Sequence, residues 1–402
     1  MAPIQQIPFD LLSEIFLLCT IAKPLAPMVI ASVNHTWRQT ILATPIAWSR
    51  IFMHFPDAIV VPPAYVSIFM TRSDPCLLHV GLPARVHRRP DDKCDRSNSY
   101  CNCPDVRLLL KNSHRIQCLT IDASWFEEFS QSSYPNLHQL RVTDSRRTIA
   151  TIRLRLSDFP GLQSLDICAW KCKYFDLSSL PPSRMDHFSV QADKHGYWDK
   201  LTRSYAETLH TLRLFGPFRM VNNPKWTFEL PMLKSLLINE RSDRWKENLS
   251  PPVFEINAPA LTVLSLILLV YKSPQDGLRI IHKGTIDNLR YIWTNRPIQL
   301  RSYSHLHVIY VSNDYTIFED IVGQLEGDVT LCPYLATIDL MFTNILPGGE
   351  HDHLKERLET RNGKAGSSIT VTFGLFPSVD MPEFHPRVSL VVPMLYSLLK
   401  TF

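Results

Sequence analysis

The chain has 402 residues, 45% apolar and 20% charged, which is typical of a folded protein with an extensive core. Its 42 basic and 38 acidic residues leave a net charge of +4, so composition gives no electrostatic case for binding nucleic acid or a membrane surface. The longest apolar run, 261–271, is about half the roughly 20 residues of a spanning helix, and we expect no signal peptide. Nine cysteines without a regular framework favour the reducing cytoplasm or nucleus.

Residues 7–48 predict three short helices. The run IPFDLLSEIFLLC (7–19) starts a helix with Pro8 in its first turn, and helical spacing of apolar residues continues through 28–44. A bundle this small buries little core, so surplus apolar side chains indicate either a partner site or packing against the rest of the chain. The apolar residues of the first helix are Phe9, Leu11, Leu12, Ile15, Phe16, Leu17 and Leu18.

The order of residues in this segment is more specific than its composition. Its characteristic groups are Ile7-Pro8, Asp10-Leu11-Leu12, Glu14-Ile15-Phe16, Val33, Trp37-Arg38 and Thr44-Pro45 through Trp48-Ser49. Over residues 4–52 this order resembles the F-box, most closely that of mushroom-forming fungi. Asp10 stands where glutamate is usual, and Asn34 where cysteine is usual.

The resemblance implies an F-box domain at 1–55 that docks on a Skp-type adaptor as a helix in a groove. The adaptor would connect the chain to a cullin and so to a cullin–RING ubiquitin ligase. The residues that match the F-box core or its adaptor surface are Pro8, Leu11, Leu12, Ile15, Phe16, Val33 and Trp37.

Residues 56–105 are expected to connect this domain to the rest of the chain. Their charged loop at 87–103 holds one histidine and three cysteines, residue types that bind zinc. The C-x₂-C pairs typical of zinc sites are missing, so we expect a charged insertion rather than a metal site.

A repeated apolar triplet organises residues 106–345. Successive copies start 17 to 29 residues apart, centred on the period of leucine-rich repeats, and half of them carry a proline two residues before the first apolar position. A weaker copy is Leu289-Ile292-Thr294. The other copies are Ile116-Leu119-Ile121, Leu137-Leu140-Val142, Leu162-Leu165-Ile167, Met185-Phe188-Val190, Leu209-Leu212-Leu214, Leu233-Leu236-Ile238, Leu261-Leu264-Leu266, Leu306-Ile309-Val311 and Leu335-Ile338-Leu340.

Each repeat would supply one strand and a return segment, and stacked repeats would bury the apolar side that a single repeat leaves exposed. We therefore predict an α/β fold, in which the short all-α F-box bundle precedes an irregular leucine-rich-repeat solenoid with an inner parallel sheet. Residues 346–402 are expected to add a last strand at 368–376 and a cap at 387–402. Because the repeats form their own core, they should fold without residues 1–52.

Residues beside the buried positions of a strand point to the other side of its sheet. We expect target binding there, or else ordinary surface packing, and arginine and aromatic residues dominate binding energy at interfaces. The candidates are Arg213, Phe215, Tyr291, Trp293 and Tyr310, with Asp339 beside them. A basic cluster would suit an acidic or phosphorylated target but is more typical of a solvated face. It comprises Arg141, Arg146, Arg147, Arg153 and Arg155.

Together with the resemblance, these patterns predict a non-catalytic substrate receptor of an SCF-type ubiquitin ligase, with no cofactor and no metal. It would bind an unidentified protein substrate for ubiquitin-dependent degradation. His351 and His353 are expected in a polar loop, and no phosphate-loop or hydrolase motif is present in the sequence. The alternatives are a leucine-rich-repeat scaffold without a ligase role, and an enzyme whose site the sequence does not reveal.

Overall fold

The computed structural model describes residues 7–53, 64–82, 104–129, 131–143, 153–168, 174–176, 184–191, 197–216, 218, 225–241, 253–269, 279–282, 287–295, 297–312, 315–342, 350–365 and 368–375. The chain divides into two compact units, residues 1–261 with 268–286, and residues 262–267 with 287–402. Both are mixed α/β, and thirteen of the described strands belong to a large parallel sheet. The α/β class is therefore confirmed.

The first unit begins with α1 (Phe9–Ala22), α2 (Ala26–Val33), α3 (His35–Leu42) and a 3₁₀ turn at Pro45–Trp48. Helix α1 starts one residue after Pro8, whose carbonyl oxygen accepts a hydrogen bond from the Leu12 amide at 3.0 Å. Asn34 has an extended backbone, and its Oδ1 accepts a hydrogen bond from the Trp37 amide at 2.8 Å. Asn34 therefore caps α3, which explains why the apolar pattern of 28–44 forms two helices.

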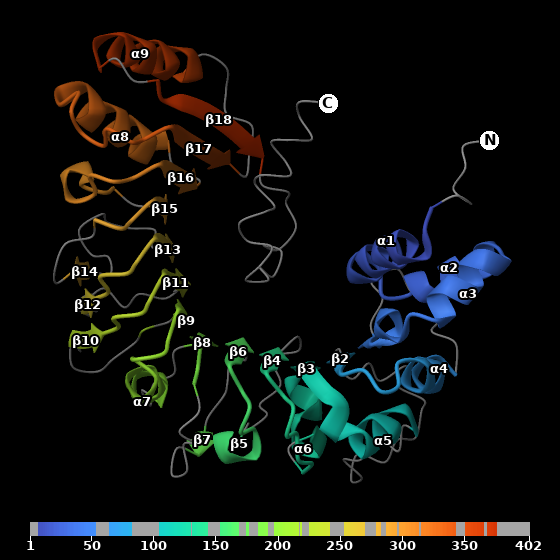
Figure 1. Cartoon of the computed structure of the whole chain (residues 1–402). Coiled ribbons are helices and arrows are strands. Elements are labelled where there is room, and N and C mark those ends of the chain that lie inside the picture. Colours follow the sequence, from blue (N-terminus) through green and yellow to red (C-terminus); the bar gives the residue numbers. More distant parts are fainter. Residues whose placement is uncertain are drawn as a thin grey trace, which may run out of the picture. The chain divides into compact units, whose positions relative to one another are not determined.

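The parallel strands of the first unit follow one another in chain order, apart from the strands of two smaller sheets (Figure 1). Their register places the middle residue of each apolar triplet beside the next, so Leu165 pairs with Phe188 and Leu212 pairs with Leu236. These strands are β1 (Arg50–Phe52), β2 (Leu78–Leu82), β3 (Ile116–Asp122), β4 (Gln139–Thr143), β6 (Ser164–Cys168), β8 (His187–Gln191), β9 (Thr211–Phe215) and β11 (Ser235–Arg241).

The segment 56–105, predicted as a connection, also contains regular structure. It holds α4 (Tyr65–Arg72), strand β2 and the start of α5 (Pro104–Lys111). Strand β2 pairs with β1 on one side and β3 on the other, so the sheet begins before the first predicted repeat. Gly81 on β2 lies opposite Phe52, and a Cβ atom at this position would collide with the Phe52 ring.

The return segments of the first unit lie on one face of the large sheet (Figure 1). An aromatic cluster joins α7 to the three-stranded sheet, with Trp198 and Trp226 ring centroids 5.2 Å apart and Trp226 and Phe254 centroids 4.7 Å apart. The elements are η3 (Ser113–Arg115), η4 (Ala123–Trp125), α6 (Phe126–Phe129), η5 (Leu156–Asp158), α7 (Tyr197–Ser204), the parallel pair β5 (Arg153–Arg155) and β7 (Tyr174–Asp176), and the three-stranded sheet β10 (Lys225–Glu229), β12 (Val253–Asn257) and β14 (Arg279–His282).

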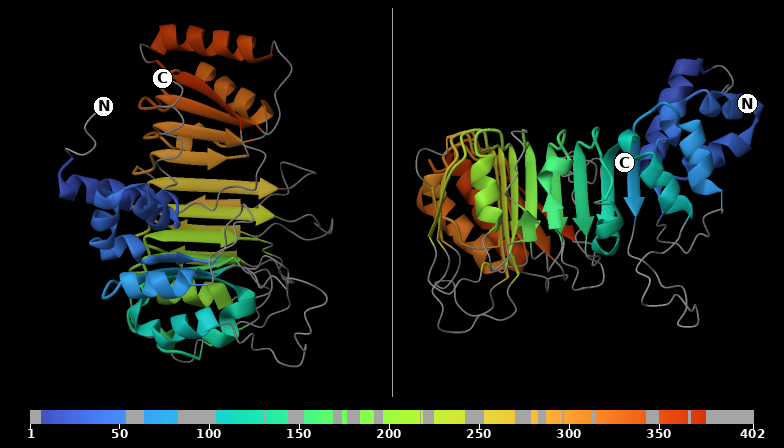
Figure 2. Two further views of the ribbon diagram at one scale, coloured as in Figure 1. Left: turned by 90° about the vertical axis from the view of Figure 1, so that its right-hand side faces the viewer. Right: turned by 90° about the horizontal axis from the view of Figure 1, so that it is seen from below.

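The second unit continues the same pattern of parallel strands, and Figure 2 shows α8 beside α9. Strand β18 confirms the last strand predicted at 368–376, and an ion pair joins the helices, with Arg357 Nε 3.0 Å from Glu326 Oε1. The elements are β13 (Val263–Leu269), β15 (Tyr291–Thr294), η6 (Leu300–Ser302), β16 (Val308–Ser312), α8 (Tyr315–Gly327), β17 (Thr337–Phe342), α9 (Glu350–Ala365) and β18 (Thr370–Leu375).

The prediction of a polar loop at His351 and His353 is wrong, because both residues lie in α9. This helix is polar overall, but it buries Leu358 and Arg361, and Arg361 Nη2 donates to the Val329 carbonyl oxygen at 3.2 Å. Burial of these two side chains therefore stabilises a helix whose sequence shows no long apolar stripe. The predicted cap at 387–402 and the cysteine-containing loop at 87–103 both lie outside the described residues.

Candidate protein-binding surfaces

Exposed apolar side chains are concentrated in the N-terminal helices. Of the twelve large apolar side chains that are exposed in the described residues, nine lie between residues 9 and 46. A surface so rich in exposed apolar groups is typical of a protein-binding site. The nine residues, named here the N-terminal apolar surface, are Phe9, Leu11, Ile15, Leu18 and Ile21 of α1, Val29 and Val33 of α2, Leu42 of α3, and Ile46.

The opposite side of α1 forms a core with the neighbouring helices. Leu12 is 4% exposed and Phe16 2%, and the Phe16 and Trp37 rings meet edge to face with centroids 5.2 Å apart. Trp48 is fully buried, and its indole nitrogen donates a hydrogen bond to the Ile41 carbonyl oxygen at 2.8 Å. These contacts hold the helices together without using the N-terminal apolar surface.

The residues predicted to contact an adaptor therefore fall into two groups. Pro8, Leu11, Ile15 and Val33 are exposed, whereas Leu12 and Phe16 are buried within this chain. Leu12 and Phe16, which the resemblance placed in the F-box core or on its adaptor surface, belong to the core. Trp37 is half-buried against Phe16. Phe9, Leu18, Ile21 and Val29 are also exposed but were not among the predicted adaptor contacts. For Phe9, Leu18 and Ile21, the excess of apolar residues on the first helix was the available signal.

The helical region is joined to the first strands through α4. The Trp48 and Phe69 rings have centroids 5.1 Å apart, and the Arg72 guanidinium carbon lies 4.5 Å from the Trp48 ring centroid. A guanidinium placed over the face of a tryptophan ring is a favourable cation–π contact, so this pair stabilises the packing of α4 on the helical region.

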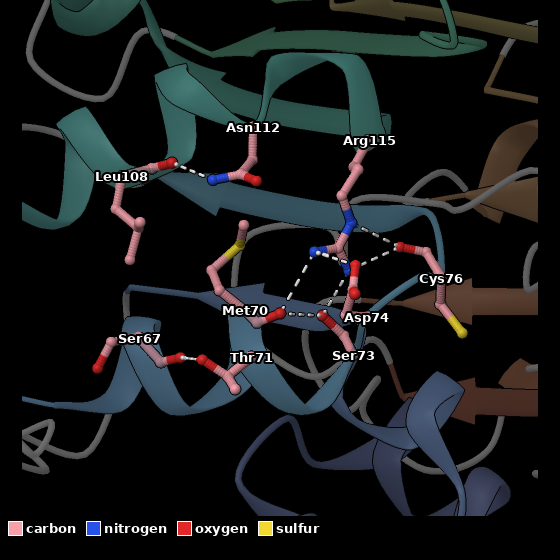
Figure 3. Close-up of polar contacts among 9 residues, drawn as sticks. All are labelled: Ser67, Met70, Thr71, Ser73, Asp74, Cys76, Leu108, Asn112 and Arg115. Carbon is pink, nitrogen blue, oxygen red and sulfur yellow. Dashed lines mark hydrogen bonds and ion pairs between the residues drawn. The ribbon is translucent and has the colours of Figure 1, made fainter.

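Arg115 fixes the end of α4 at the start of β3 (Figure 3). It is 9% exposed, and its guanidinium donates to the Cys76 carbonyl oxygen at 3.0 Å and to Ser73 Oγ at 3.0 Å. Its Nη1 lies 3.3 Å from both the Met70 carbonyl oxygen and Asp74 Oδ1. Because a guanidinium offers five donors in a fixed plane, one side chain satisfies several acceptors around this turn.

In the first unit, the side of the sheet opposite the return segments carries a polar row. Register places Arg141 beside Asp166, Asp166 beside Ser189, and Ser189 beside Arg213. Arg141 Nε lies 3.4 Å from Asp166 Oδ2, and both side chains are largely buried. The expectation that Arg141 lies on a solvated face is therefore wrong. Arg155 is exposed, and Arg146 and Arg147 lie outside the described residues.

His187 lies on the same face, two residues before Ser189 on β8. Burial, and secondly the positive charge of Arg213, lower the pKa of His187 to about 4, while the charge of Asp166 opposes the shift. Its Nδ1 and the side-chain amide of Asn239 have no hydrogen-bond partner in the described structure, although His187 is 8% exposed and Asn239 1%. Buried polar groups of this kind carry a free-energy cost unless a hydrogen-bond partner or an ordered water satisfies them.

In the second unit, the corresponding face carries aromatic residues. Register places Trp293 beside Tyr310, Tyr310 beside Asp339, and Asp339 beside Thr372. The Trp293 and Tyr310 ring centroids are 6.0 Å apart at an interplanar angle of 40°. Burial, with the neighbouring Asp339 charge second, raises the pKa of Tyr310 to about 12, and burial also raises the pKa of Asp339.

All five residues predicted for target binding are half-buried. In each unit they lie on the face of the large sheet opposite the buried triplet residues. In β9, Arg213 and Phe215 alternate with the fully buried Leu212 and Leu214. In β15, Tyr291 and Trp293 alternate with the fully buried Ile292 and Thr294, so the alternation predicted from sequence is observed. Tyr310 is likewise half-buried beside Ile309.

Within the described part of the chain, no group of three or more histidine, cysteine or carboxylate side chains is arranged to hold a metal ion. No helix in that part is both long and apolar enough to cross a membrane.

Fold and surfaces together define a mixed α/β protein with a large parallel sheet and an exposed apolar surface on its first helices. Comparison with known proteins found no matching family model and no matching curated protein.

Proposed function

We propose that this chain is the substrate-recognition subunit of an SCF-type ubiquitin ligase. In this proposal α1–α3 form an F-box that binds a Skp-type adaptor, and the parallel strands form an irregular leucine-rich-repeat solenoid that binds the target protein. The chain acts in the cytoplasm or nucleus and contributes no catalytic residue. A conjugating enzyme brought by the cullin then meets the bound target at high effective concentration.

The observation that carries the proposal is the division of α1 into two sides. Leu12 and Phe16 hold the helix in its own core, while Leu11 and Ile15 remain 58% and 44% exposed. Full burial of an exposed apolar side chain is worth roughly 1.5–3 kcal/mol, so a partner that covers these half-exposed side chains gains part of that free energy. An amphipathic helix that lies in a groove of its partner has this geometry.

The register of the repeated triplets supports the second half of the proposal. Apart from the half-buried Leu266, each described triplet buries its middle and last residues on the packed side of the sheet, while polar and aromatic residues alternate toward the other side. Stacked units of this kind present a row of side chains from many strands to one ligand. Specificity for the target therefore resides in residues such as Arg213 and Tyr310.

The test compares intact chain with a Leu11→Asp, Ile15→Asp variant in co-purification with a Skp-type adaptor. Both residues are exposed, so the variant should fold normally, and we expect it to lose at least about 100-fold in adaptor affinity, since central interface residues contribute about 2 kcal/mol or more each. Met232→Asp is the matched control, because Met232 is 43% exposed but lies outside the N-terminal helices. If intact chain does not retain the adaptor, a repeat scaffold without a ligase role becomes the better account.

A further inference from the structure

The face of the second unit that carries Trp293 has a composition different from that of the first unit. Three neighbouring strands place an indole, a phenol and a carboxylate side by side, in the order Trp293, Tyr310 and Asp339. Tyr291 lies two residues before Trp293 on β15 and on the same face. The row thus combines aromatic rings with one negative charge.

Asp339 is held in place but is not neutralised. It accepts a hydrogen bond from the Thr372 hydroxyl on β18. Among the described residues, no lysine or arginine forms an ion pair with it, whereas Asp166 pairs with Arg141 and Glu326 pairs with Arg357. Burial raises the pKa of Asp339, the direction expected for a carboxylate that has lost part of its hydration.

We propose that the row Trp293–Tyr310–Asp339 binds a lysine or arginine side chain of the target polypeptide. Aromatic faces attract cations, most strongly for tryptophan, and a half-buried carboxylate supplies a charge-assisted hydrogen bond to the same group. The inference rests on the proposed function, because it assigns one chemical feature to the target that the chain recognises. An acidic or phosphorylated segment is disfavoured here, since it would place like charge beside Asp339.

Random 12-residue displayed peptides, selected on the immobilised intact chain, provide the probe. We expect the selected peptides to share a lysine or arginine. Replacing that residue with glutamine should weaken binding by roughly 10-fold, and Asp339→Asn should weaken binding of the original peptide by a similar factor. The two changes together should cost little more than either alone, because each removes the same contact.

Matched variants separate this contact from general damage to the unit. Tyr310→Phe keeps the aromatic face and should bind within about 2-fold of the intact chain, whereas Tyr310→Leu should lose roughly 5-fold. Glu356→Gln removes one negative charge from the exposed surface of α9 and should have no effect. Thermal melting of each variant checks that the unit is folded.

The proposal is overturned if no peptide is enriched, if the selected peptides lack a basic residue, or if Asp339→Asn binds them as tightly as the intact chain. Adaptor capture by the Asp339→Asn variant is measured in parallel and should be unchanged. If the intact chain does not bind the adaptor, the proposed ligase function is contradicted instead. Failure of the basic-residue site and failure of the ligase proposal are therefore distinguishable.

Discussion

Adjacent residues of α1 occupy opposite environments. Leu12 is 4% exposed and Leu11 58%, so truncating them should have different effects on folding. Leu12→Ala creates a cavity and should lower the free energy of unfolding of the helical region by about 2–5 kcal/mol, whereas Leu11→Ala should change it by at most about 0.5 kcal/mol. Amide hydrogen exchange of α1–α3 measures both, and equal losses would contradict the division of this helix into core and docking sides.

A second residue-scale prediction concerns His187, whose pKa is lowered to about 4 by burial and by Arg213. Between pH 6.5 and 4 the unfolded chain binds a proton at this histidine that the folded chain does not bind. Stability from the neutral His187 is therefore complete above pH 6.5 and falls as the pH drops toward 4, by about 3 kcal/mol in total. Asp166, Arg141 and Arg213 are the charged groups that act on it.

Denaturant unfolding at several pH values, compared between the intact chain and His187→Gln, isolates this contribution. The variant should lose less stability than the intact chain on acidification from pH 6.5 to 4. Parallel losses in the two proteins would show that His187 is not held neutral in the fold.

At the scale of elements, Arg115 links α4 to β3. Arg115→Ala leaves the Cys76 and Met70 carbonyl oxygens without their guanidinium donor, and we expect a loss of about 3 kcal/mol in the stability of the first unit. Arg115→Lys keeps the charge but cannot form the same fork, so it should recover only part of the loss. Lys111→Ala, an exposed change on α5, is the control, and an equal effect of all three on thermal unfolding would contradict this role.

The elements that were predictable from sequence are those whose pattern is repeated or long. The apolar triplets located the strands of the large sheet from β3 to β17, because each of these strands buries the same alternation against its neighbours. Strands β1 and β2 were not predicted, since Arg50–Phe52 is only 3 residues long and β2 contains Gly81. Strands β10, β12 and β14 lay in presumed return segments, although Trp226 and Phe228 show the alternation that could have revealed β10.

The candidate binding surfaces, like the strands, were predictable from sequence only in part. Alternation along a strand predicted that Trp293 and Tyr310 share a face with Asp339, because side chains of parallel strands in register stand side by side. Composition could not tell Leu11 from Leu12, since both fit a helical apolar stripe and only the packing of Phe16 on Trp37 decides which side is buried. Arg141 looked like a solvated charge because its partner, Asp166, lies 25 residues away in sequence.

At the scale of the molecule, removal of residues 1–52 tests how independent the repeated strands are. The deletion removes β1 together with the fully buried Trp48 and Ile51, and it exposes Phe69 and the edge of β2. The remaining triplets keep their core, so we expect a cooperative but lower thermal transition. Non-cooperative melting of this fragment would refute the prediction that the repeats fold on their own.

The central claim is that the N-terminal apolar surface binds a Skp-type adaptor. Isothermal titration of a purified Skp-type adaptor into the intact chain tests it most directly, with the Leu11→Asp, Ile15→Asp variant and the Met232→Asp control titrated alongside. The account predicts saturable 1:1 binding by the intact chain and the control, and at least about 100-fold weaker binding by the double variant. Absence of binding by the intact chain, or unchanged affinity in the folded double variant, would contradict it.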